Sequence, residues 1–286
     1  MSGGVLALVA AAAVAHATWN LTIKRARTSG TRFLWLTFVV ATLVFTPFGI
    51  VSLTTAGSAL PLLIALAVGS AILQLGYFLL LQRGYRLGDV SIVYPLARGT
   101  GPLLSVVFGI VLFGERPGIF ALVGAGVLIA GVVVIGLAGG RARFGDNRIG
   151  ILYGSLVGVM IAAYTLWDAN AVGHAHLPTL GYFWVSLVVQ LVAFAPFALR
   201  QPGQTAAIAR SHWRAVITVG ILSPLAYVLI LFAFTLAPVS LVAPAREVSV
   251  VLVALGGWLW FTEPNPVQRI VGAVVVLGGV ALLALG

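Results

Sequence analysis

The amino-acid sequence predicts an all-α integral membrane protein in which ten transmembrane helices form two inverted repeats of five helices each. Three observations predict this fold: the composition, a series of long apolar runs and an internal repeat. Of the 286 residues, 61% are hydrophobic and 8% are charged. A soluble domain carries about 25% charged residues, because its surface faces water. Too little charge remains here to cover a globule, so lipid is the predicted solvent.

Apolar runs of about 20 residues, long enough to cross about 30 Å of hydrocarbon, recur along the whole chain. Short connections separate them and leave no stretch for an extramembranous domain. The first run lacks a preceding charged segment, so it is predicted to be a span and not a removable signal peptide. The predicted spans cover residues 4–23, 31–52, 60–82, 89–113, 117–138, 149–171, 178–199, 214–236, 239–261 and 266–285.

The basic residues predict the orientation of the chain. The 16 Lys and Arg give a formal net charge of +10. They are scattered among loops without forming a patch, so no nucleic-acid partner is predicted. Arg116 lies in an even-numbered loop, and Arg98 and Arg246 lie within spans; the other thirteen (16 − 3) follow odd-numbered spans. The positive-inside rule therefore places the odd-numbered loops in the cytoplasm and both termini outside.

A shift of 148 or 149 residues aligns the two halves of the sequence span for span. The matches include Trp19-Asn20 with Trp167-Asp168, residues 90–95 with 239–244, Arg98 with Arg246, and residues 113–115 with 261–263. Residues 1–144 and 145–286 are therefore predicted to be two repeats that together form one membrane domain. Since five is odd, the second repeat is inverted relative to the first. Such repeats are typical of secondary transporters, because exchanging the conformations of the halves reverses the opening of a shared cavity.

Two arginines within spans are the strongest candidates for a site. An ionisable group at membrane depth costs at least about 2.5–3.5 kcal/mol, so it normally faces a cavity or a partner. Arg98 and Arg246 each follow a proline, which frees backbone carbonyls and allows the helix to bend or unwind. A guanidinium there suits a substrate carboxylate or phosphate. The alternative is an internal salt bridge, for which Glu247 stands beside Arg246.

Other polar residues within the spans extend this candidate site. His16, Trp19 and Asn20 share one helix face and predict a cavity wall; the alternative is a histidine bonded to a nearby backbone carbonyl. Asp168 is either solvated near a helix end or buried, and a buried Asp168 would bind a substrate amine or titrate as a proton-coupling group. Tyrosines in spans also serve as simple packing residues. The predicted substrate-binding residues are His16, Trp19, Asn20, Gln74, Tyr77, Tyr94, Arg98, Tyr164, Asp168, Tyr227, Arg246 and Glu247.

No motif for chemistry is present. The sequence lacks a phosphate-binding glycine loop with lysine, a pair of histidines at metal-binding spacing and a nucleophile elbow. Its lack of cysteine excludes disulfides and thiolate metal sites. Glu115 and Glu263, close to prolines at span ends, are predicted to be capping or interfacial. We therefore predict no catalytic residue, no metal and no cofactor, and transport driven by a gradient or by exchange.

The five-plus-five duplication, with Gly-Glu or Thr-Glu ending spans 4 and 9 and a Gly-rich helix after each, resembles an EamA-type member of the drug/metabolite transporter superfamily. The resemblance covers the whole chain. Residues 16–20, 87–99 and 164–168 resemble a bacterial subgroup whose substrates are mostly unassigned. The resemblance implies alternating access and export of amino acids, metabolites or drugs, often coupled to protons. It also implies a cavity lined by the first four spans of each half. Many members place both termini in the cytoplasm, which conflicts with the charge count retained here.

These observations together predict a secondary transporter, an exporter or exchanger, of a small polar metabolite such as an amino acid or organic acid. It is expected in the inner (plasma) membrane, surrounded by lipid. We expect transport to be coupled to protons or to a counter-substrate, and the protein to be a monomer or a homodimer. A sugar-phosphate or nucleotide-sugar exchanger is an alternative that would want further basic residues. A membrane-embedded enzyme using His16 and Asp168 would concentrate its groups in one half, and a channel would pass solute without saturation.

Overall fold

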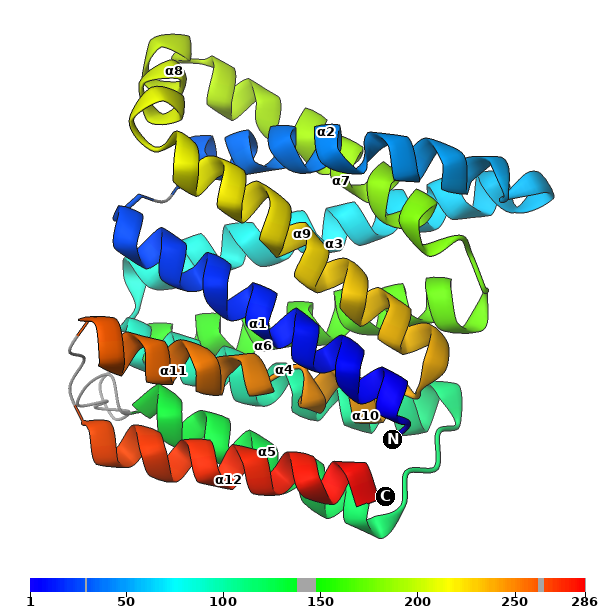
Figure 1. Cartoon of the computed structure of the whole chain (residues 1–286), viewed down its shortest axis with the longest axis vertical. Coiled ribbons are helices and arrows are strands. Elements are labelled where there is room, and N and C mark those ends of the chain that lie inside the picture. The colour runs from blue at the N-terminus through cyan, green and yellow to red at the C-terminus, as the bar shows by residue number, and fades with distance from the viewer. Residues whose placement is uncertain (29, 138–147, 262–264, 286) are drawn as a thin grey trace.

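A computed structural model of the chain describes residues 1–28, 30–137, 148–261 and 265–285. Within these residues all regular structure is helical, and ten helices or helix pairs are long and apolar enough to cross a membrane. They lie side by side and run across Figure 1, so that both termini lie at its right-hand end. The predicted fold class is confirmed.

The elements follow the predicted spans closely. The first half contains α1 (Gly3–Ala26), α2 (Thr31–Thr54), the 3-10 helix η1 (Gly57–Ala59), α3 (Leu60–Leu87), α4 (Val90–Phe113) and α5 (Ile119–Leu137). The second half contains α6 (Arg148–Ala169), the π-helical segment η3 (Asn170–His174), α7 (Thr179–Leu199), α8 (Pro202–Ser211), α9 (Trp213–Leu236), α10 (Val239–Ala245), α11 (Val248–Phe261) and α12 (Pro266–Leu285). The short helix α8 was not predicted.

The two halves differ at their shared proline motif. The ninth span is broken at Arg246 and Glu247, which separate α10 from α11 just after Pro244. Its counterpart α4 continues unbroken through Pro95. A Cβ atom built on Gly136 of α5 would lie 2.7 Å from the Pro95 ring, so the glycine leaves room for that ring. Of the predicted bending or unwinding at these prolines, the second half shows unwinding after Pro244, whereas α4 does not unwind at Pro95.

The packing of the helices reflects the inverted repeat. Helix α1 packs against α9 and α11 of the second half, and α6 packs against the corresponding helices of the first half, α3 and α4. Across the halves, α2 pairs with α7 and α5 with α12. Each contact therefore has its counterpart when the halves are exchanged. The predicted boundary at 144/145 lies outside the described residues, as do Arg141, Arg143 and Glu263.

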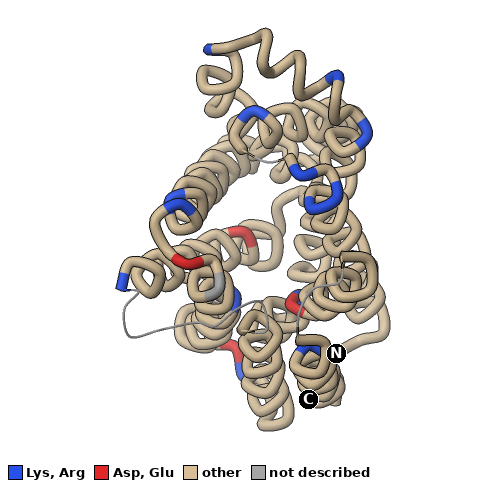
Figure 2. Tube along the Cα trace, turned by 90° about the vertical axis from the view of Figure 1, so that its left-hand side faces the viewer, with Lys and Arg blue, Asp and Glu red and all other residues tan. Residues whose placement is uncertain are grey.

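The basic residues of the described odd-numbered loops share one end of the molecule. The C-terminal ends of α1, α3, α7 and α11 lie at the left-hand end of Figure 1, which faces the viewer in Figure 2. Most of the Lys and Arg positions lie toward the viewer there. This arrangement agrees with the charge pattern, and the assignment of this end to the cytoplasm stays a prediction.

Glycines bring α5 and α12 into backbone contact. A Cβ atom built on Gly279 would lie 2.6 Å from the Leu128 nitrogen and 2.7 Å from the Gly124 oxygen. One on Gly131 would lie 2.9 Å from the Gly272 oxygen. Small residues at such interfaces let helices approach closely in a membrane, where packing stabilises helix association.

We expect Gly279→Val to lower the free energy of unfolding by about 1–3 kcal/mol, because the new side chain would be forced into the α5 backbone. The neighbouring Gly278 is a matched control, since a Cβ atom there would meet nothing within 4 Å. Thermal unfolding in detergent should show a lower Tm for Gly279→Val and a nearly unchanged Tm for Gly278→Val. Equal decreases in the Tm of the two variants would contradict the close contact of α5 and α12 at Gly279.

Candidate functional site

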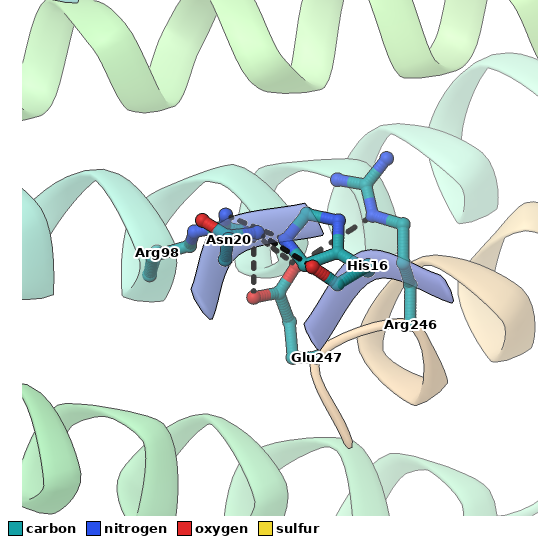
Figure 3. Close-up of polar contacts among 5 residues, drawn as sticks. All are labelled: His16, Asn20, Arg98, Arg246 and Glu247. Atoms are coloured by element: carbon teal, nitrogen blue, oxygen red, sulfur yellow. Dashed lines mark hydrogen bonds and ion pairs between the residues drawn. The ribbon is translucent and has the colours of Figure 1, made fainter. Parts of the chain in front are cut away.

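The carboxylate of Glu247 lies between two guanidinium groups at the break in the ninth span (Figure 3). Arg98 Nη1 lies 3.2 Å from Oε2 and 3.4 Å from Oε1, and Arg246 Nε lies 3.6 Å from Oε1. Glu247 is only 1% exposed, whereas the side chains of Arg98 and Arg246 keep 18% and 12% of their accessible surface. The group therefore joins the two halves and leaves both arginines partly accessible inside the bundle.

The first span adds its polar face to this group. His16 Nε2 lies 3.4 Å from Arg98 Nη2, and the Asn20 amide donates to the His16 carbonyl at 2.8 Å. The Trp19 ring meets the His16 ring edge-on at 4.9 Å, and among the described residues its buried Nε1 has no acceptor. The Arg98 guanidinium lies 5.7 Å from the Tyr94 ring centre. Among the described residues the His16 ring thus contacts an arginine, and it makes no hydrogen bond to a backbone carbonyl of the kind that the alternative interpretation requires.

Asp168 forms the centre of a second polar group. It is fully buried and accepts hydrogen bonds from the hydroxyls of Tyr182, at 2.5 Å, and of Tyr227. The Ser70 side chain lies beside this carboxylate and beside the Tyr182 hydroxyl. The alternative of a solvated acid near a helix end is wrong, because η3 continues beyond α6 and tyrosines of α7 and α9 cover the carboxylate.

Side chains of α3 and α7 extend this second group. The Gln74 amide donates to Ser70 at 2.9 Å, and the Gln190 amide lies 3.3 Å from the Gln74 oxygen and 3.1 Å from the Ser186 hydroxyl. Both Ser70 and Gln190 are only 1% exposed. A polar network therefore crosses from the first half to the second within the bundle.

Tyr164 connects the aromatic residues of the two halves. Its ring lies 5.7 Å from that of Tyr77 and 6.2 Å from that of Tyr227, both close to edge-on. Tyr227 in turn reaches Asp168. The structure thus places all twelve predicted residues in these two groups or in direct contact with them. Their role in substrate binding stays a prediction.

Four residues of the second group were not predicted: Ser70, Tyr182, Ser186 and Gln190. A signal for them exists in the sequence. Tyr182, Ser186 and Gln190 recur every four residues along the apolar α7, and Ser70 and Gln74 do the same in α3. Residues at this spacing share one helix face, so such a stripe indicates a face turned toward polar neighbours.

Glu115 acts as a cap at the end of the molecule opposite the basic loops. Gly114 adopts a left-handed conformation, with φ of 66°, which ends α4. The two carboxylate oxygens of Glu115 then accept from the backbone nitrogens of Val239, at 2.7 Å, and Ser240, at 2.9 Å. The predicted capping role of Glu115 is confirmed. A cavity of about 290 Å³ lies beside it, lined by Ala169, Gly173, His174 and residues 234–239.

Within the described residues, no group of three or more His, Asp or Glu side chains is close enough to hold a metal ion. Two guanidiniums share one carboxylate, which favours binding of an anion, and the hydrogen bonds that the described residues give to the second buried carboxylate, Asp168, come from neutral hydroxyls.

The described residues form ten spans in two related halves of opposite orientation, which enclose polar groups between them. These features define a multi-pass membrane protein of the transporter class. The model of the EamA-like transporter family matches residues 3–137 and 148–285. The chain belongs to this family, and thereby to the drug/metabolite transporter superfamily. The predicted family is confirmed, and the two separate matches agree with the repeat.

Two individual proteins are also similar to the chain. A protein named Multidrug transporter PA4990, from Pseudomonas aeruginosa, is 32% identical over 107 residues, which cover 37% of this chain and 93% of that protein. A solved structure described as "Crystal structure of protein" has a TM-score of 0.76 and 20% sequence identity, and the match covers 100% of this chain and 98% of the other. The second likeness shows the fold alone.

Proposed function

We propose that the chain is a secondary transporter of a small anionic or zwitterionic metabolite, such as an amino acid or organic acid. It exports or exchanges this substrate across the inner (plasma) membrane by alternating access of its inverted halves. Membership of a transporter family supports the transport function. The substrate class is proposed from one observation: the guanidiniums of Arg98 and Arg246 share the single carboxylate of Glu247.

The two arginines have different roles in this proposal. Arg98 contacts both oxygens of Glu247 and the His16 ring, so it positions the carboxylate. Arg246 uses only its Nε, at 3.6 Å, and its terminal nitrogens point away from Glu247 in Figure 3. A guanidinium fork of this kind pairs with a carboxylate through two parallel hydrogen bonds. Arg246 is therefore the proposed anchor for the substrate anion.

Asp168 is the proposed coupling residue. Its oxygens already accept hydrogen bonds from Tyr182 and Tyr227, and a substrate amine would have to displace these donors. Uptake and release of a proton needs no such displacement, and it changes the charge of the site by one unit. This favours proton coupling over amine binding at Asp168.

The test begins with a thermal-shift screen of the purified chain against amino acids, organic acids and drugs, since a ligand of one folded state raises the Tm. Drugs belong in the screen because the Pseudomonas relative is named a multidrug transporter. Proteoliposomes should then show saturable flux of the ligand and acceleration by the same ligand inside the vesicle. Non-saturable flux would indicate a channel, and the absence of flux for every ligand would refute the proposal.

The same vesicles test the coupling residue. Asp168→Asn should retain exchange of labelled for unlabelled substrate, while flux driven by an imposed pH gradient falls to the background rate. An unchanged pH-driven flux in this variant would exclude Asp168 as the coupling group and leave the transport function standing.

Neither alternative function gains support from the site. A sugar-phosphate exchanger would want further basic side chains, and the described contacts of this group bring in only His16 beside the two arginines. An enzyme that used His16 and Asp168 as its acid and base would require these two side chains to lie close together. Within the described part of the chain no hydrogen bond joins these two residues, which belong to different polar groups.

A further inference from the structure

The short helix α8 has no helical counterpart of its length in the first half, where the equivalent connection is the three-residue η1. It lies beyond the ends of α7 and α9, at the upper left of Figure 1. Six arginines lie within or directly beside the ends of α1, α2, α7, α8 and α9 at the basic end of the molecule, and we call this set the cationic corner: Arg25, Arg27, Arg32, Arg200, Arg210 and Arg214. The transport architecture is built from equivalent elements in both halves. Because α8 lacks an equivalent of its length, we look for a role of α8 that is separate from transport.

Apolar contacts beneath α8 hold the corner together. Ile208 of α8 packs against a buried cluster of Phe33, Ala215, Val216 and Val219, which Ile23 and Ala26 of α1 also contact. The Thr205 hydroxyl donates to the Ala198 carbonyl at 2.6 Å. The Arg32 guanidinium donates to the Gln201 side-chain oxygen at 2.5 Å. The ends of α1 and α7 and the starts of α2 and α9 are thereby fixed around α8.

No acidic residue of the neighbouring sequence neutralises this corner. Residues 24–32 and 197–214 contain no Asp or Glu. All the arginines of the corner except Arg32 are exposed. The buried Nε of Arg32 has no acceptor among the described residues. The corner therefore presents several guanidinium groups whose natural partners are anions from outside the chain.

Two arginine–aromatic pairs flank α8, at the points where α7 ends and α9 begins. The Arg200 guanidinium lies 5.6 Å from the Phe197 ring centre, and that of Arg214 lies 5.2 Å from the Trp213 ring. Phe197 is 51% exposed and Trp213 is 53% exposed. Tryptophan rings at span ends are enriched at the level of the lipid headgroups, and Trp213 occupies such a span end. The Arg214 guanidinium beside this ring is therefore expected near the lipid phosphates.

We propose that the cationic corner binds the headgroups of anionic phospholipids in the leaflet at the basic end of the molecule. Exposed rings at the membrane boundary favour a lipid over a soluble anion, because a soluble anion uses the charge alone. The arginine forks pair with the phosphates, and the rings pack beside the glycerol region. This inference does not depend on the proposed substrate or coupling mechanism.

The test measures lipid retention by the full chain in neutral detergent, by native mass spectrometry, with phosphatidylglycerol and phosphatidylcholine as probes. The wild type should retain phosphatidylglycerol in preference. The variant Arg200→Gln/Arg214→Gln should lose roughly 25-fold in phosphatidylglycerol affinity, from about fivefold per basic residue at an anionic membrane surface. The matched control is Arg83→Gln/Arg86→Gln, which removes two exposed arginines from the end of α3 at the same end of the molecule.

The proposal would be supported if Arg83→Gln/Arg86→Gln retained phosphatidylglycerol and Arg200→Gln/Arg214→Gln lost it. Equal retention of the two lipids by the wild type would overturn it. Equal losses in both double variants would also overturn it, since net charge and not the corner would then govern binding. Displacement of phosphatidylglycerol by inorganic phosphate at millimolar concentration would assign the corner to a soluble anion instead.

Discussion

Replacing Glu247 with glutamine is expected to lower the free energy of unfolding by about 3–5 kcal/mol, because it leaves two largely enclosed arginines without their counter-charge. The carboxylate is 1% exposed and contacts both Arg98 and Arg246. Glutamine has nearly the same shape, so the loss would report charge and not packing. Unfolding of the purified variant in a sodium dodecyl sulfate titration measures the effect.

The double variant Arg98→Gln/Glu247→Gln provides the control. Removal of both partners of a buried pair costs less than removal of one, because no isolated charge remains from that pair. The double variant should therefore be more stable than Glu247→Gln alone. A Glu247→Gln variant as stable as the wild type would show that the ion pairs across the halves do not hold the bundle together.

Arg246→Gln is expected to raise the half-saturation concentration for transport by about 10- to 150-fold, which corresponds to about 1.5–3 kcal/mol for a hydrogen bond to a charged group. Its Tm should stay close to that of the wild type, because Glu247 keeps the shorter contact with Arg98. Initial rates in proteoliposomes, measured over a range of substrate concentrations, give the half-saturation value.

Arg116→Gln is the matched control for this measurement, since Arg116 is exposed at a span end away from both polar groups. It should leave the half-saturation concentration unchanged. If Arg246→Gln instead lowered the Tm as much as Glu247→Gln and left the half-saturation concentration unchanged, Arg246 would be a structural residue and not the substrate anchor.

The fold was predictable because membrane spans are specified locally. About 20 apolar residues suffice to predict a span, and an odd number of spans per repeat fixes the inversion. The outcome at the prolines was not predictable in this way. Pro95 and Pro244 occupy matching positions, yet only the second interrupts its span. Gly136 leaves room for the Pro95 ring from another helix, and the local pattern around Pro95 does not include that residue.

The membership of the site was easier to predict than its pairings. The alternative of an internal salt bridge paired Glu247 with its neighbour Arg246, and the nearer partner of Glu247 is Arg98, 149 positions away in the sequence. The burial of Asp168 depended on Tyr182 and Tyr227, which arrive from two other helices. Helix α8 was missed because its polar, alanine-containing sequence lacks the apolar periodicity that marks a helix packed on a core.

The exchange of first helices between the halves has a mechanical consequence. Because α1 packs on helices of the second half and α6 on helices of the first, neither half of the sequence would move as a rigid body. In the proposed alternating access, a rotating body would combine helices from both halves, and the chain would cross between such bodies just after α1 and just after η3. Both crossings contain left-handed residues, Arg27 and Gly30 in one and His176 in the other. These two short tethers, far apart in the sequence, would absorb the torsion of every transport cycle.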